Sequence, residues 1–159
     1  MKQQSFSSLA YNNKKITTKR ERFLNEMNQV IPWERLLKII EPHYPRAGNG
    51  RPPILMAMML RIYFLQQWYA LGDQAAEESL YDMESMRRFA GLELIEDVIL
   101  DETTILNFRH LIEKHNLSSA LFDDINAYLV SQGIAVSKGS MIDATIVQAP
   151  SSSLSLSQL

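Results

Sequence analysis

Residues 52–71, PPILMAMMLRIYFLQQWYAL, decide the fold. Apolar side chains fall on nearly every side of a helix drawn through Ile54–Leu71, and this pattern is typical of a helix at the centre of a core. Pro52 and Pro53 suit the first turn of that helix, where a missing backbone N–H costs nothing. Gly72 is expected to end it.

The same apolar run raises the question of a membrane span. Arg61, Gln66 and Gln67 interrupt it near the middle, and an arginine at the centre of a bilayer costs about 3 kcal/mol on insertion scales. We therefore predict a buried helix and no membrane partner. The composition, 46% hydrophobic and 21% charged over 159 residues, is that of a globular domain. The absence of cysteine excludes disulfides and thiolate sites and suits a reducing cytoplasm.

Working outward from this helix, periodicity predicts further helices on both sides. Phe23, Leu24, Met27 and Val30 recur at helical spacing between Arg20 and Val30, and a short helix follows Pro32. On the other side, helices are expected after Asp73, over Ser85–Ala90, over 101–115 and over 118–133, with Asp73 and Asp101 as N-caps. Residues 42–53 hold too many prolines and glycines for regular structure.

The helical pattern does not cover the two ends of the chain. Residues 1–19 lack periodicity, so we expect a flexible basic arm there. Residues 20–133 form the predicted helical domain. Residues 134–150 change to short β-like segments, Ile134–Val136 and Met141–Val147, which predict a β-hairpin. The Ser/Leu string 151–159 is expected to be a disordered tail. The fold class is therefore mainly α with a short hairpin.

Charge is segregated along the chain although the net charge is only −2. Residues 1–22 hold six cations against Glu21, residues 42–72 hold three arginines and no acid, and residues 73–102 hold ten acids against Arg87 and Arg88. An acidic middle repels a phosphate backbone. Any DNA contact must therefore come from particular basic faces.

The helix predicted over 101–115 is the best candidate for such a face. Ile105, Phe108 and Ile112 form one apolar stripe, and a polar stripe lies on another side. The polar stripe comprises Thr103, Asn107, His110 and Lys114. Such side chains hydrogen-bond base edges or phosphates in the major groove, but a solvated helix face has the same pattern. Additional phosphate contacts are predicted from arginines near this helix and in the loop before the central one: Arg46, Arg51, Arg87, Arg88 and Arg109.

Asp143 interrupts the apolar run 141–147. A charge in a buried strand is costly unless it is paired or binds metal, which suggests a metal ligand. The alternative is that Asp143 and Thr145 share the wet face of an edge strand. The three histidines show no zinc-site spacing, and Gly48-Asn49-Gly50 lacks the ending of a P-loop.

An ordered series of short strings resembles the N-terminal part of transposases of the insertion-sequence-five family. The strings include Ile31-Pro32-Trp33, Glu41 to Pro45, Gly48 to Pro53, Met83 to Leu92, Asp101 to His110, and Ile142 to Pro150. The resemblance implies a helical domain with helix-turn-helix-like elements that binds the terminal inverted repeats of the element. About twenty residues separate the Asp73 helix from the Asp101 helix, so any such motif is an elaborated one.

The resemblance also implies that an RNase H-like domain follows, with an Asp, Asp, Glu catalytic set and Mg²⁺. Asp143 matches the first of these carboxylates. Two magnesium ions held by three carboxylates activate the attacking group and stabilise the leaving oxygen, so one carboxylate alone is expected to be inactive. The likeness stops after Ser152, from which we expect a frameshift, an early stop or a decayed copy.

Three functions remain open from the sequence. The first is an end-binding module, cytoplasmic and nucleoid-associated, whose partners are double-stranded repeat DNA and a second transposase chain in a homodimer or heterodimer. The second is a regulator that inhibits the full-length enzyme. The third is a decayed helical interaction module without affinity for DNA.

Overall fold

The computed structural model describes residues 6–46, 56–92 and 100–134, and within these ranges the regular structure is helical, without strands. The helices are α1 (Phe6–Asn12), α2 (Lys19–Val30), α3 (Trp33–Ile40), the 3₁₀ turn η1 (Glu41–His43), α4 (Met56–Tyr69), α5 (Asp73–Asp82), α6 (Glu84–Ala90), α7 (Glu102–Lys114) and α8 (Leu117–Ser131). The mainly α prediction is confirmed, whereas the predicted hairpin over 134–150, the tail 151–159 and Pro52–Pro53 lie almost wholly outside the described residues.

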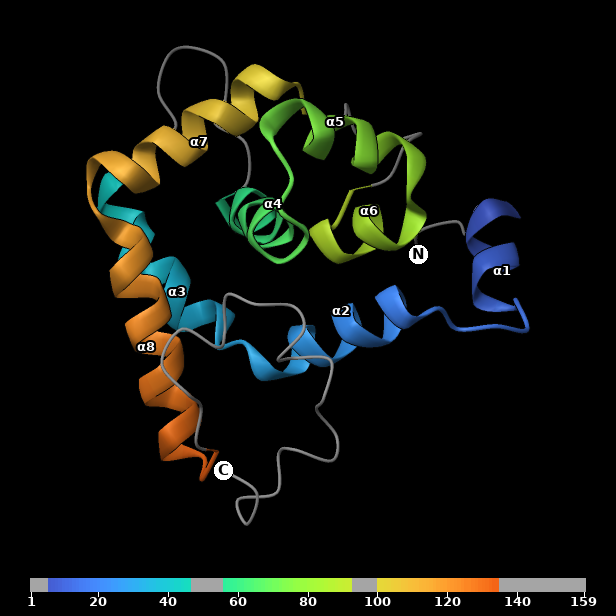
Figure 1. Ribbon diagram of the computed structural model, residues 1–159, viewed down its shortest axis with the longest axis horizontal. Coiled ribbons are helices and arrows are strands. Elements are labelled where there is room, and N and C mark those ends of the chain that lie inside the picture. The colour runs from blue at the N-terminus through green and yellow to red at the C-terminus, as the bar shows by residue number, and fades with distance from the viewer. Residues whose placement is uncertain (1–5, 47–55, 93–99, 135–159) are drawn as a thin grey trace.

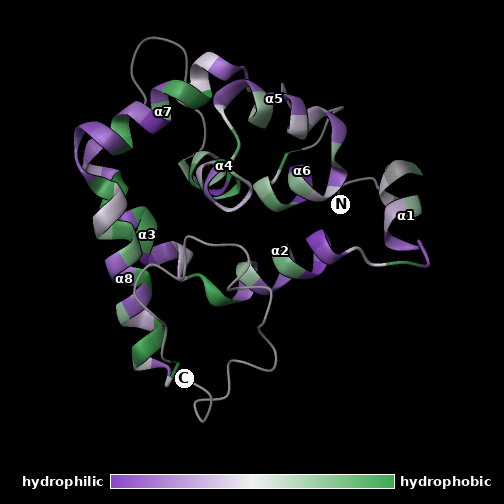
Figure 2. Ribbon diagram, viewed as in Figure 1, coloured by the Kyte–Doolittle hydropathy of each residue, from purple (hydrophilic) through white to green (hydrophobic). Residues whose placement is uncertain are grey.

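Helix α4 is the centre of the core, as its all-round apolar sequence predicts. It packs against α3, α5, α6 and α7 (Figure 1). Leu60 and Phe64 are fully buried, and Gln66 is buried as well. The surrounding helices carry hydrophobic and hydrophilic residues side by side (Figure 2), because each of them has one face on the core and one in solvent.

Helices α2 and α3 follow the predicted pattern. Phe23, Leu24 and Met27 are buried on α2, and Leu36 and Ile40 are buried on α3. A capping box starts α2: the Thr18 hydroxyl accepts a hydrogen bond from the Glu21 N–H (3.2 Å), and the Glu21 carboxylate accepts one from the Thr18 N–H (3.3 Å). This motif fixes where the helix begins.

Helix α1 lies within the segment where the sequence predicts an arm without periodicity. This helix of 7 residues carries Phe6 and Leu9, which are both exposed, so it has no buried apolar stripe. Arg88 of α6 hydrogen-bonds Ser8 and Asn12 of this helix. The local sequence pattern does not reveal α1, and these contacts come from Arg88, a residue far away in the chain.

The turn between α4 and α5 differs from the sequence prediction in two ways. Helix α4 ends at Tyr69, and Ala70, not Gly72, takes the left-handed conformation, with φ 51°. The Leu71 N–H then bonds the Gln66 carbonyl at 3.0 Å. The N-cap of α5 is Gly72, so the prediction that Asp73 caps this helix is wrong. The Asp73 carboxylate is held by other partners.

Candidate nucleic-acid interface

Helix α7 is held firmly enough to present a fixed outer face. The Asp101 carboxylate accepts a hydrogen bond from the Thr104 N–H at 2.8 Å, which confirms the predicted cap. The Glu102 N–H donates to the Glu77 carboxylate of α5 at 2.8 Å. Inside, Ile105, Phe108 and Ile112 are buried as predicted, so the rotation of the helix about its axis is fixed by packing.

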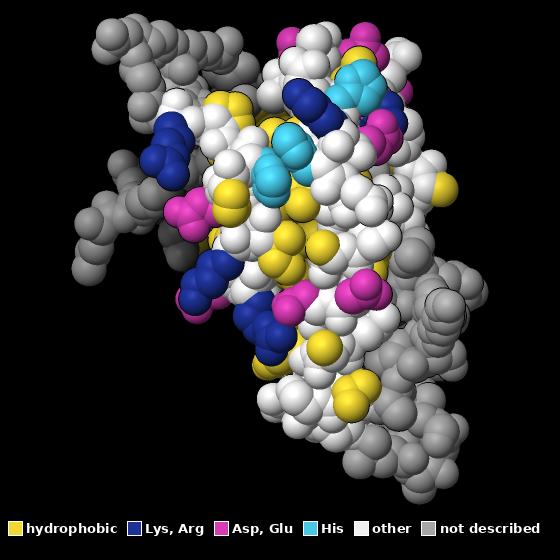
Figure 3. Space-filling model, turned by 90° about the vertical axis from the view of Figure 1, so that its left-hand side faces the viewer, with side chains coloured by type: hydrophobic (Ala, Val, Ile, Leu, Met, Phe, Trp, Pro, Cys, Tyr) yellow, Lys and Arg dark blue, Asp and Glu magenta, His cyan; other side chains and the backbone are white. Residues whose placement is uncertain are grey.

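The outer face of α7 is the polar stripe that the sequence predicts. Thr103, Asn107, His110 and Lys114 are all exposed. They recur at spacings of four, three and four residues, so they form one line along the helix. Figure 3 looks onto the side of the molecule that α7 and α8 form, where histidine, basic and acidic side chains lie among uncharged ones. This stripe offers amide, hydroxyl, imidazole and ammonium groups to a ligand.

Arg109, predicted as a phosphate contact, takes part in an internal ion pair. Its Nε and Nη2 donate to the two carboxylate oxygens of Asp73 at 3.1 and 2.9 Å, and its Nη1 donates to Glu113 at 2.8 Å. The buried Gln66 also donates to Asp73, at 2.9 Å. The hydrogen bonds from Arg109 lower the pKa of Asp73, and the same bonds raise that of Arg109. Arg109 therefore joins α7 to α5.

Arg87 and Arg88 of α6 are likewise bound inside the chain. Arg87 donates to the carbonyls of Leu80 and Tyr81 at the end of α5, at 2.8 and 2.6 Å. The Arg88 guanidinium lies over the Tyr11 ring, 4.0 Å from its centroid, and also contacts Glu84. Both side chains position helices, and nothing in their contacts singles them out for phosphate.

The remaining predicted residues fall outside the α7 face. Arg46 is exposed, three residues beyond η1. Arg51 and Asp143 lie outside the described residues. Within the described ranges, no three His, Asp or Glu side chains are grouped to hold a metal ion. The arrangement that the structure does assemble is therefore the line of four side chains on α7.

The structure adds a histidine pair that spacing does not predict. The rings of His43 and His115 stack, with centroids 4.2 Å apart and an interplanar angle of 30°. Partial desolvation lowers the pKa of His115, and the charges of His43 and Lys114 lower it further. Because the two residues lie far apart in the chain and come together only through folding, no local signal could have found them.

Residues 12–111 match the model of a transposase-domain family, DUF772. The chain belongs to this family. The match covers α2 through α6 and most of α7 in this transposase domain, and it includes Thr103, Asn107 and His110. It extends over more than half of the 159 residues.

No solved structure matches the domain. In the three described ranges, none of the helices has the length and hydropathy needed to cross a bilayer, and α4, which the apolar run 54–71 predicts, is packed inside the protein.

Proposed function

We propose that this transposase domain binds the terminal inverted repeats of an insertion element through the polar stripe of α7. The observation that carries the proposal is the exposed line of Thr103, Asn107, His110 and Lys114 on a helix whose opposite side is buried. An α-helix fits the major groove, where its outward side chains reach base edges. Membership of a transposase-domain family supports DNA as the partner.

Three residues of the stripe have a specific role in this proposal. Asn107, near the middle of α7, is suited to a bidentate contact with the N6 and N7 positions of adenine. Thr103, in the first turn, can contact a thymine methyl group or a phosphate. Lys114, at the C-terminal end, supplies a phosphate contact. Arg109 contributes indirectly, because its ion pair with Asp73 sets the position of α7 against α5.

The test is binding of the full chain to a labelled duplex of the terminal repeat, against a scrambled duplex of equal length, by fluorescence anisotropy. Repeat-specific binding is expected. Asn107→Ala should weaken repeat binding roughly fivefold to a hundredfold, the range for one lost bidentate base contact, and should leave binding to the scrambled duplex unchanged. Gln132→Ala, an exposed amide beyond the end of α8, is the matched control. Equal affinity for both duplexes would contradict the proposal.

A further inference from the structure

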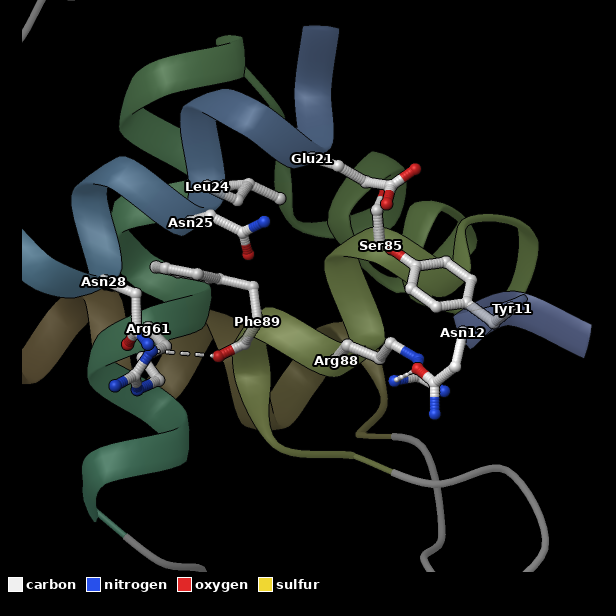
Figure 4. Close-up of a pocket in the computed structure, with 10 residues that line it drawn as sticks. All are labelled: Tyr11, Asn12, Glu21, Leu24, Asn25, Asn28, Arg61, Ser85, Arg88 and Phe89. Carbon is white, nitrogen blue, oxygen red and sulfur yellow. Dashed lines mark hydrogen bonds between the residues drawn. The ribbon is translucent and has the colours of Figure 1, made fainter. Parts of the chain in front are cut away.

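A polar pocket lies on the other side of α4 from the α7 stripe. Its volume is about 330 Å³, and its walls come from α2 and α6, with α1 at one end and Arg61 of α4 at the other (Figure 4). The volumes of small-molecule sites begin at about 300 Å³, so this pocket is large enough for one small molecule or one nucleotide unit. It shares no residue with the α7 stripe.

Arg61 is the unusual group in this pocket. Its guanidinium lies over the Trp33 ring, 4.2 Å from the centroid, and 5.0 Å from that of Phe89, and it donates one hydrogen bond to the Phe89 carbonyl at 3.1 Å. Burial lowers its pKa. Within the described part of the chain, no carboxylate forms an ion pair with Arg61. A half-buried cation without a counter-charge favours an anionic ligand.

The rest of the pocket offers neutral hydrogen-bonding groups next to this cation. Asn25 and Asn28 lie one turn apart on α2 and are exposed, and Ser85 of α6 also lines the pocket. Figure 4 shows Asn28 beside Arg61 at one end, with Arg88, Asn12 and Tyr11 at the other. An asparagine amide has both a donor and an acceptor, and it therefore matches the edge of a base.

The charged groups at the far end are already paired. The Glu21 carboxylate accepts a hydrogen bond from Lys14 and belongs to the α2 capping box. The Arg88 nitrogens hydrogen-bond Glu84, Asn12 and Ser8. Arg61 is therefore the one charge lining the pocket, among the described residues, that has no charged partner in the chain.

We propose that this pocket binds a single nucleotide unit, with its phosphate on Arg61 and the edge of its base on Asn25 and Asn28. The unit comes either from a free nucleoside monophosphate or from the unpaired 5′-phosphorylated end of a DNA strand, and both present the same phosphate and base. This site is separate from the duplex interface on α7, so either can fail without the other.

Calorimetric titration of the full chain tests the site with three probes: inorganic phosphate, deoxyadenosine monophosphate and a 5′-phosphorylated trinucleotide. The nucleotide is expected to bind more tightly than phosphate. Asn25→Ala and Arg61→Lys should each weaken nucleotide binding by roughly tenfold or more, because a charge-assisted or bidentate contact is lost. Trp33 fluorescence should change on binding, since its ring lies against Arg61.

Lys19→Ala, an exposed cation at the start of α2, is the control and should bind the nucleotide as the unchanged chain does. If Arg61→Lys fails to fold, Asn25→Ala still decides, because Asn25 is exposed. Tighter binding of the trinucleotide than of the monophosphate identifies a strand end as the source, and the reverse order identifies the free nucleotide. No binding of either, or equal binding of phosphate and nucleotide, would overturn the proposal.

Discussion

At the scale of single residues, the contact between Arg109 and Asp73 joins α7 to α5, although the two residues are 36 positions apart in the chain. Two parallel hydrogen bonds form this contact. The Asp73 side chain is 17% exposed and the Arg109 side chain is 33% exposed. Asp73→Asn should lower the free energy of unfolding by about 1 kcal/mol, because one partner of a well-aligned, partly screened pair loses its charge. Urea denaturation followed by circular dichroism measures this change.

Asp82→Asn, an exposed aspartate at the end of α5, is the control and should unfold at the original urea concentration. The difference in free energy of unfolding between Asp73→Asn and the unchanged chain should also depend on pH. In the folded state the hydrogen bonds from Arg109 lower the pKa of Asp73 below its ordinary value of 3.8. The carboxylate therefore stabilises the fold fully above pH 3.8, and this stabilisation is lost as the pH falls through the lowered pKa. A difference that persists undiminished at pH 2 would count against the ion pair.

The stacked rings of His43 and His115 should make stability depend on pH in a higher range. Partial desolvation and nearby positive charge lower the pKa of His115 in the folded state. Protonation then favours the unfolded chain, so the fold is most stable above the ordinary histidine value of 6.5 and loses stability as the pH falls below it. His115→Gln should reduce the fall in melting temperature between pH 7.5 and pH 5, as differential scanning fluorimetry would measure.

His110→Gln is the matched control for this experiment, because it removes a histidine of α7 that is not part of the stacked pair. It should leave the pH dependence of the melting temperature as it is in the unchanged chain. If the melting temperatures of His115→Gln and His110→Gln fall equally between pH 7.5 and pH 5, the stacked pair does not cause the pH dependence.

At the scale of elements, α1 depends on contacts with α6. A helix of 7 residues is too short to be stable alone, and Arg88 contacts it at Ser8, Tyr11 and Asn12. Tyr11 also hydrogen-bonds Glu21 of α2, and burial together with that bond raises the pKa of Tyr11 to about 12.

Arg88→Ala should therefore release α1 without unfolding the core. Trypsin should cleave after Lys14 and Lys15 several times faster in this variant, and mass spectrometry would identify the fragments. Arg22→Ala, an exposed arginine on α2, should leave the rate unchanged. Equal cleavage rates for the two variants would show that Arg88 does not hold α1.

The elements that sequence predicts well are those whose own apolar pattern is clear. The apolar residues of α2 and α7 repeat at helical spacing, and those of α4 lie on nearly every side of the helix, so the existence of all three follows from the chain alone. Helix α1 has no such stripe, because its apolar residues Phe6 and Leu9 face solvent. Ala70 takes a backbone conformation that glycine usually adopts, and nothing at that position signals it.

The candidate sites divide in the same way. The stripe on α7 is a repeat within one helix, so spacing predicts that Thr103, Asn107, His110 and Lys114 share a face, and the structure places all four in solvent. Whether an arginine is available to a ligand depends on partners elsewhere in the chain. Arg109 is taken by Asp73, whereas Arg61, which the sequence presents only as an interruption of an apolar helix, lines a pocket.

At the scale of the whole molecule, the internal pairing of arginines limits how strongly salt can affect DNA binding. The net charge is −2, and Arg87, Arg88 and Arg109 are bound to partners within the fold. Glu102 and Glu113 lie on α7 itself and are exposed, so they oppose a close approach of phosphates along the whole helix. Binding through the α7 stripe should therefore involve few phosphate contacts.

The logarithm of the binding constant for repeat duplex should fall with the logarithm of salt concentration with a slope of about −3 or shallower, since each phosphate contact contributes about −0.9. Lys114→Ala should make that slope about one unit shallower, whereas Asn107→Ala should lower affinity and leave the slope unchanged, because an amide releases no counterion. Anisotropy titrations between 50 and 300 mM salt measure both. A slope near −8 would show that DNA contacts the basic N-terminal segment or another cationic surface in place of α7, and a slope unaffected by Lys114→Ala would remove that residue from the interface.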